Sequence, residues 1–61
     1  MEDIYYNIGQ QVVLQDKPLV RVNHNLRPGL VGTVVSVGRG ELDVRIDGNI
    51  WRFPVDHWMP L

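Results

Sequence analysis

The clearest pattern in this chain is an alternation of apolar and polar residues on both sides of Asp47-Gly48. It runs through residues 42–46 (LDVRI) before this pair and through residues 49–53 (NIWRF) after it. Alternation with a period of two predicts half-buried β-strands. Asp-Gly between two such runs predicts a hairpin with a type I′ turn, because both residues tolerate the positive φ that this turn requires. The segment therefore predicts a two-stranded hairpin with a defined register.

In this register, directly opposed residues share a face of the hairpin. The face that we expect to be buried carries Leu42, Val44, Ile46, Trp51 and Phe53. The outer face carries Asp43, Arg45, Ile50 and Arg52, with Asp43 opposite Arg52 as a pair of opposite charges. A shift by one residue would move Trp51 and Phe53 into water, so the apolar side chains hold the register more firmly than the charges do.

The other strands are expected from shorter β-branched or apolar runs. Gly32 lies inside one of them, which indicates a bulge or a close approach of two backbones. Trp58 is expected to pack beneath the sheet in the last strand, whereas Tyr5 and Tyr6 either cover one end of the core or contact a partner. The predicted strands beside the hairpin are residues 8–14, 30–37 and 58–61, with a tight loop at 38–41 and a single 3₁₀ turn at 54–57.

The longest connection spans residues 15–28 and is rich in turn-forming Asp, Asn and Pro. Within it, residues 19–22 (LVRV) alternate weakly and are interpreted as a short irregular strand. A loop of this length in so small a domain is usually folded back on itself or functional.

These elements predict an all-β fold with five short strands. Five such strands in a flat sheet would expose one hydrophobic face, whereas a sheet that curls into a small barrel buries it and protects its edges. With 61 residues the chain is expected to form one domain. We divide it into an N-terminal lead-in, residues 1–7, and a barrel, residues 8–61.

Two segments also resemble a known family. Residues 29–37 (GLVGTVVSV) place a glycine before a valine-rich strand, and residues 42–48 (LDVRIDG) follow as an alternating hairpin. This pattern resembles the KOW-like subset of SH3-like barrels, and the strand and loop order resembles an SH3-like barrel over residues 8–61. The resemblance implies a five-stranded SH3-like barrel with a long first loop, and it implies RNA or ribosome association as one function.

Charge argues against that function. The formal net charge is −1, whereas nucleic-acid-binding members of this class are typically basic and gain affinity from phosphate neutralisation. Residues 17–28 differ from the chain average, because they carry Lys17, Arg21 and Arg27, together with the titratable His24, and no acidic residue. The segment suits an acidic protein surface or a phosphate.

Catalytic and metal-binding chemistry is not expected. The chain has no cysteine and two histidines, so neither a structural zinc site nor a cofactor is predicted. Asp56 and His57 are neighbours, and side chains of neighbouring residues on an extended chain point apart. We expect Asp56 to cap the 3₁₀ turn through backbone N–H groups and His57 to be partly exposed.

No apolar run approaches the roughly 20 residues of a membrane span, and the N-terminal residues lack the pattern of a signal peptide. The expectation is a soluble cytoplasmic protein without membrane contact.

The preferred hypothesis is a non-enzymatic binding module, an accessory or regulatory subunit that docks onto the acidic surface of a larger protein assembly. Its binding residues are expected on the long loop and the outer sheet face: Lys17, Arg21, His24, Arg27, Arg45, Ile50 and Arg52. The first alternative is a KOW-like factor associated with RNA or the ribosome. The second is an oligomeric barrel with a ligand or active site between subunits.

Overall fold

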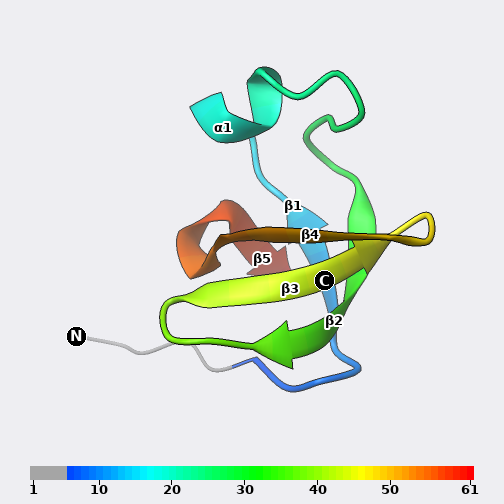
Figure 1. The fold of residues 1–61 in the computed structure, drawn as a ribbon, viewed down its shortest axis with the longest axis vertical. Coiled ribbons are helices and arrows are strands. Elements are labelled where there is room, and N and C mark those ends of the chain that lie inside the picture. The colour runs from blue at the N-terminus through cyan, green and yellow to red at the C-terminus, as the bar shows by residue number, and fades with distance from the viewer. Residues whose placement is uncertain (1–5) are drawn as a thin grey trace.

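The computed structural model describes residues 6–61 and contains five antiparallel strands in one sheet (Figure 1). The strand order is β4-β3-β2-β1-β5, and the all-β prediction is confirmed. The elements are β1 (Gln11–Leu14), α1 (Pro18–Arg21), β2 (Val31–Val37), β3 (Glu41–Ile46), β4 (Asn49–Pro54), the 3₁₀ turn η1 (Val55–His57) and β5 (Trp58–Pro60).

The β3–β4 hairpin has the predicted register. Leu42 pairs with Phe53 and Asp43 pairs with Arg52, and the pairing continues to the turn. Asp47 has a φ of 50° and Gly48 a φ of 83°, and a positive φ at both positions is what a type I′ turn requires.

The sheet is curled because its two edge strands are close neighbours in sequence. β4 and β5 lie at opposite ends of the strand order, yet only the three residues of η1 separate them. In a flat five-stranded sheet the edges would be about 19 Å apart. The chain from the end of β4 to the start of β5 reaches at most about 15 Å. The sheet must therefore bend, and its shape is compatible with a small barrel.

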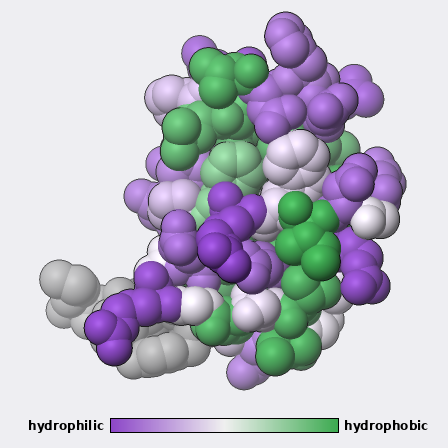
Figure 2. All heavy atoms as spheres, viewed as in Figure 1, coloured by the Kyte–Doolittle hydropathy of each residue, from purple (hydrophilic) through white to green (hydrophobic). Residues whose placement is uncertain are grey.

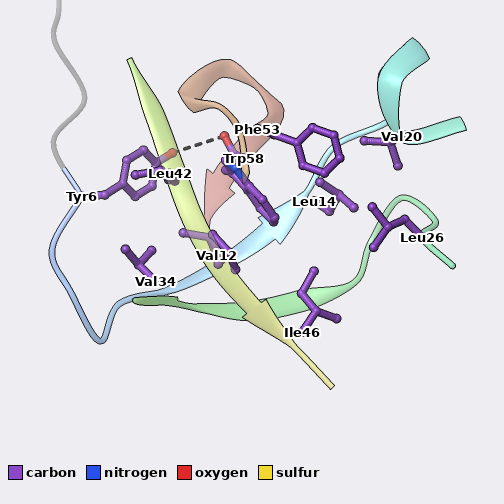
Figure 3. Close-up of a cluster of buried hydrophobic side chains, with 11 residues drawn as sticks. Tyr6, Val12, Leu14, Val20, Leu26, Val34, Leu42, Ile46, Phe53 and Trp58 are labelled. Carbon is purple, nitrogen blue, oxygen red and sulfur yellow. Dashed lines mark hydrogen bonds between the residues drawn. The ribbon is translucent and has the colours of Figure 1, made fainter. Parts of the chain in front are cut away.

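The hydrophobic core fills the inside of this curl (Figure 3). Trp58 is buried as expected, and Tyr6 packs at one end of the same cluster. The Tyr6 hydroxyl donates a hydrogen bond to the Trp58 carbonyl at 3.2 Å, and burial raises the pKa of the Tyr6 phenol. Tyr6 thus covers the core, whereas Tyr5 lies outside the described residues. The buried apolar side chains are Tyr6, Val12, Leu14, Val20, Leu26, Val34, Leu42, Val44, Ile46, Phe53 and Trp58.

Gly32 allows two strands to approach closely. A Cβ at this position would lie 2.5 Å from Val44 Cγ1 and 2.7 Å from the Arg45 carbonyl oxygen. The predicted close approach is confirmed, and a register shift between Val34 and Ser36 places a bulge further along β2.

Some predicted boundaries and burials were wrong. The first strand begins at Gln11 rather than Ile8, because Asn7 to Gln10 form a turn in which Gly9 has a φ of 93° and the Gln10 N–H donates to the Asn7 carbonyl. Trp51 is only half-buried. It faces the core side but lies on β4, which is an edge strand of the sheet formed by residues 6–61.

The strand predicted over residues 19–22 is also wrong, because residues 19–21 belong to the helical turn α1 and Val22 is its C-cap. Pro18 is its first residue, and the fixed φ of proline suits the first helical position. Over residues 6–61, no helix has the length and apolar character needed to cross a membrane.

Candidate functional site

The long loop, residues 15–28, is a folded element that is anchored to the core. Val20 and Leu26 are buried, and Figure 3 shows both side chains on the same side of the core as Leu14. At the base of the loop the Gly29 N–H donates to the Leu14 carbonyl at 2.8 Å, and the Leu14 N–H donates to the Leu30 carbonyl at 2.8 Å. Two buried side chains and a hydrogen-bonded base thus anchor the loop to the core.

Short-range hydrogen bonds complete the loop between these anchors. The Val20 and Arg21 N–H groups donate to the Lys17 carbonyl at 2.9 and 3.1 Å. Further along, the Asn25 N–H donates to the Asn23 side-chain oxygen at 3.0 Å. Asparagine stabilises turns in this way because its side chain substitutes for a backbone acceptor.

Arg21 is not a free cation. Its guanidinium donates two hydrogen bonds to the Asp16 carboxylate, from Nε at 2.6 Å and from Nη2 at 2.7 Å. These bonds hold the pKa of Asp16 below its ordinary value. Asp16 lies one residue before the segment that the sequence shows to be free of acid, so it reduces the local positive charge by one.

The other basic residues predicted on the loop differ in their exposure. His24 and Arg27 are exposed, whereas Lys17 is half-buried at the N-terminal cap of α1. Neither Lys17 nor Arg27 forms an ion pair with another residue of 6–61. The two charges that remain available to a partner on this surface are therefore Lys17 and Arg27, with His24 between them in sequence.

The loop also exposes two large apolar side chains that the sequence prediction missed. Leu19 is 54 % exposed and Val22 is 75 % exposed. Positions three apart on a helical turn lie on the same face, so these two side chains are neighbours. Figure 2 shows hydrophobic atoms at the surface over α1, at the top of the view. Pro18 was the available signal, because a helical turn starting there puts Leu19 and Val22 together, whereas a strand would separate them.

The outer sheet face holds the remaining predicted residues. Arg45 is opposite Ile50, which is 57 % exposed. Arg52 binds the Asp43 carboxylate through Nε at 2.7 Å and Nη2 at 3.3 Å, and this holds the pKa of Asp43 below its ordinary value. Arg52 is therefore paired with Asp43 much as Arg21 is paired with Asp16.

The long loop and the hairpin tip are separate surfaces. In Figure 1, α1 lies above the sheet, whereas the turn between β3 and β4 projects to the right. The structure thus brings Lys17, Arg21, His24 and Arg27 into one folded loop, and it leaves Arg45 and Ile50 near the hairpin tip.

The expectations for Asp56 and His57 were wrong. His57 is buried, and its ring stacks on Phe53 with centroids 5.6 Å apart and planes at 3°. Asp56 does not cap η1, because its carboxylate accepts a hydrogen bond from His57 Nδ1 at 2.7 Å. Stacking on Phe53 holds the His57 ring at the edge of the core. The exposed Asp56 side chain folds back and provides a hydrogen-bond partner for His57 Nδ1.

This turn also supports the long loop. The Gln15 N–H donates to the His57 carbonyl at 2.9 Å, and Gln15 Nε2 donates to the Asp56 and Trp58 carbonyls at 3.1 and 2.9 Å. The first residue of the loop is therefore bonded to η1 and to the start of β5 through both its backbone and its side chain. The turn thus has a structural role in supporting the loop.

In the part of the chain that the structure describes, no three His, Cys, Asp or Glu side chains gather in a way that could hold a metal ion. Comparison of the chain with protein-family models, curated proteins and solved structures finds no match. The long loop and the outer sheet face are therefore candidate binding surfaces on their geometry alone.

Proposed function

We propose that this chain is a non-enzymatic binding module, an accessory subunit that docks through its long loop onto the acidic surface of a larger protein. The outer sheet face around Arg45, Ile50 and Arg52 would form a secondary contact. The observation that carries the proposal is the anchoring of the long loop by Val20 and Leu26, which presents exposed basic side chains on a rigid base. Small domains commonly bind through loops held by a rigid scaffold.

We further propose that the domain is an SH3-like barrel. Support comes from β5 lying beside β1, from the long connection between β1 and β2, and from the 3₁₀ turn before the last strand. This assignment is an analogy of fold and does not itself imply a function.

An RNA-binding function of the KOW-like type has less support on this surface. Proteins that bind single-stranded RNA stack its bases on aromatic side chains, and residues 15–28 contain no aromatic residue other than His24. The exposed side chains beside the cations are aliphatic, which suits a protein partner better.

The experiment is capture of partners from a lysate of the source cells by the immobilised protein, read by quantitative mass spectrometry. The Arg21→Ser/Arg27→Ser variant should keep a melting temperature within a few degrees of the wild type, because exposed charges contribute little to stability. It should lose the captured partner. Arg39→Ser, an exposed arginine on the β2–β3 turn, is the control for Arg27→Ser and should retain it.

Intact capture by the folded loop variant would overturn the proposal and direct attention to the outer sheet face. A parallel titration with RNA over a salt series tests the alternative, because binding through phosphate contacts weakens steeply as salt increases.

A further inference from the structure

We infer that the long loop binds an amphipathic acidic peptide segment, in which an apolar side chain packs on Leu19 and Val22 and carboxylates meet the neighbouring cations. This inference rests on the proposed docking function and specifies the chemistry of the partner. It predicts that acidity alone is insufficient for binding.

The first observation is the exposure of the apolar pair. Leu19 in α1 and Val22, its C-cap residue, are both exposed, whereas Val20 in the same turn is fully buried at 0 % exposure. Val20 already anchors the turn, so folding does not require the other two side chains to be apolar. An apolar pair at the surface gains free energy only when a partner covers it.

The second observation is the charge around that pair. Lys17 precedes α1 and Arg27 follows it on the same loop, and neither is paired with a carboxylate among residues 6–61. Arg21, which lies between Leu19 and Val22 in sequence, already binds Asp16. Along the loop, one available cation therefore precedes the apolar pair and one follows it, and carboxylates complement both charges.

This combination favours a peptide over a nucleic acid or an anionic membrane. RNA would gain nothing from two aliphatic side chains, because its bases stack on aromatic rings. A bilayer is a continuous anionic plane, and the net charge of −1 gives the whole protein no attraction to it. A peptide contacts only the loop, so the acidic residues elsewhere in the chain oppose it less than they oppose an extended anionic plane.

The test is a selection from a displayed library of random 12-residue peptides against the immobilised full chain. Selected peptides are then synthesised and titrated against four forms of the protein. These are the wild type, Leu19→Ser/Val22→Ser, Lys17→Ser/Arg27→Ser, and the control Ile8→Ser/Val37→Ser, which removes two exposed apolar side chains outside the loop. Vesicles containing 30 % phosphatidylserine and a 20-nucleotide poly-uridine RNA are titrated in the same buffer.

The expected result is a set of peptides that carry both carboxylates and large apolar residues. Their affinity should fall more than about tenfold for Leu19→Ser/Val22→Ser and for Lys17→Ser/Arg27→Ser, and should be unchanged for the control. Within residues 6–61 none of the altered side chains forms an ion pair, and all but the half-buried Lys17 are exposed. A melting curve checks that each variant remains folded.

Several results would overturn the inference. One is a selection without any peptide that depends on Leu19 and Val22, and another is selection of acidic peptides that lack apolar residues. Stronger binding to the vesicles or the RNA would also reject it. If Arg21→Ser/Arg27→Ser loses its cellular partner in the capture experiment while Leu19→Ser/Val22→Ser keeps it, docking through the loop stands and only the amphipathic partner fails. If both variants keep that partner, the proposed function fails as well.

Discussion

The β3–β4 hairpin and the long loop both present arginines at the surface, but different interactions hold them in place. In the hairpin, adjacent strands pair residue by residue from Ile46 and Asn49 to Glu41 and Pro54, and a two-residue turn closes the ladder. In the loop, one helical turn and several single hydrogen bonds are pinned to the core by Val20 and Leu26. The hairpin is stabilised by strand pairing along its whole length, whereas the loop is held by two buried side chains and by hydrogen bonds at its base.

This difference decides which of the two regions can more easily carry binding residues. A paired ladder leaves its outer side chains limited freedom, and its arginine Arg52 is bound to Asp43 across the strands. Between its anchors the loop makes no strand pairing, so exposed side chains such as Leu19 and Val22 are not required for the fold. Binding residues are therefore more easily accommodated on the loop than on the hairpin.

The largest effect is expected in the hairpin core. Leu42→Ala removes a side chain with no exposure, and such changes cost about 2–5 kcal/mol of unfolding free energy. Ile50→Ala, on the outer face, should cost much less. Urea unfolding of both variants makes the measurement. Equal losses would mean that the two faces of the hairpin are not distinguished as described.

The next effect concerns the contact between β2 and β3. Gly32→Ala would place a Cβ within 2.7 Å of the Arg45 carbonyl oxygen, and backbone must move to accept it. Forcing extra atoms into a packed site costs about 1–3 kcal/mol. Gly38→Ala is the matched control, because its nearest neighbour would be an ordinary 3.7 Å away. Similar melting temperatures for the two variants would contradict the close strand approach.

The anchoring of the loop is tested by one substitution at two positions. Val20→Ala removes a fully buried side chain and should cost about 2 kcal/mol. Val22→Ala removes the same atoms at a position that is 75 % exposed and should be nearly neutral. Thermal unfolding distinguishes them. A neutral Val20→Ala would show that the loop is not held by the core.

The smallest expected effect is on the pH dependence of stability, to which the Arg52–Asp43 and Arg21–Asp16 ion pairs contribute differently. Arg52 and Arg21 hold the pKa values of Asp43 and Asp16 below the ordinary value of about 3.9. Each carboxylate therefore contributes stability above pH 3.9, and this contribution is lost as pH falls through the depressed pKa. With Asp43→Asn or Asp16→Asn, the free energy of unfolding should therefore decrease less steeply as the pH falls.

Asp43→Asn should have the larger effect, because the Asp43 side chain is 19 % exposed and that of Asp16 is 51 % exposed, where water screens the interaction. Chemical denaturation at a series of pH values from 5 to 2 measures both. A larger effect for Asp16→Asn would mean that the loop pair is the stronger one.

The same contrast explains what could be predicted from the sequence. The hairpin was predictable because its information is local: Asp47-Gly48 selects the turn, and alternation selects the buried face. The loop was not predictable in this way. Residues 19–22 alternate like a strand, but Pro18 begins a helical turn and the core accepts Val20 from it.

The candidate site was predictable only in part, for the same reason. The basic residues could be found by counting charges, but the pairing of Arg21 with Asp16 depends on the folded loop. The exposed pair of Leu19 and Val22 depends on it too. Likewise, the burial of His57 follows from its stacking on Phe53, a contact that forms only when η1 folds back.

The most direct test of the account is a map of backbone amide chemical shifts of the isotope-labelled protein, recorded with and without the captured partner. If the long loop is the docking surface, the largest changes will fall between Lys17 and Arg27, and those around Arg45, Ile50 and Arg52 will be smaller. Changes concentrated on the outer sheet face, with the loop amides unmoved, would contradict the account.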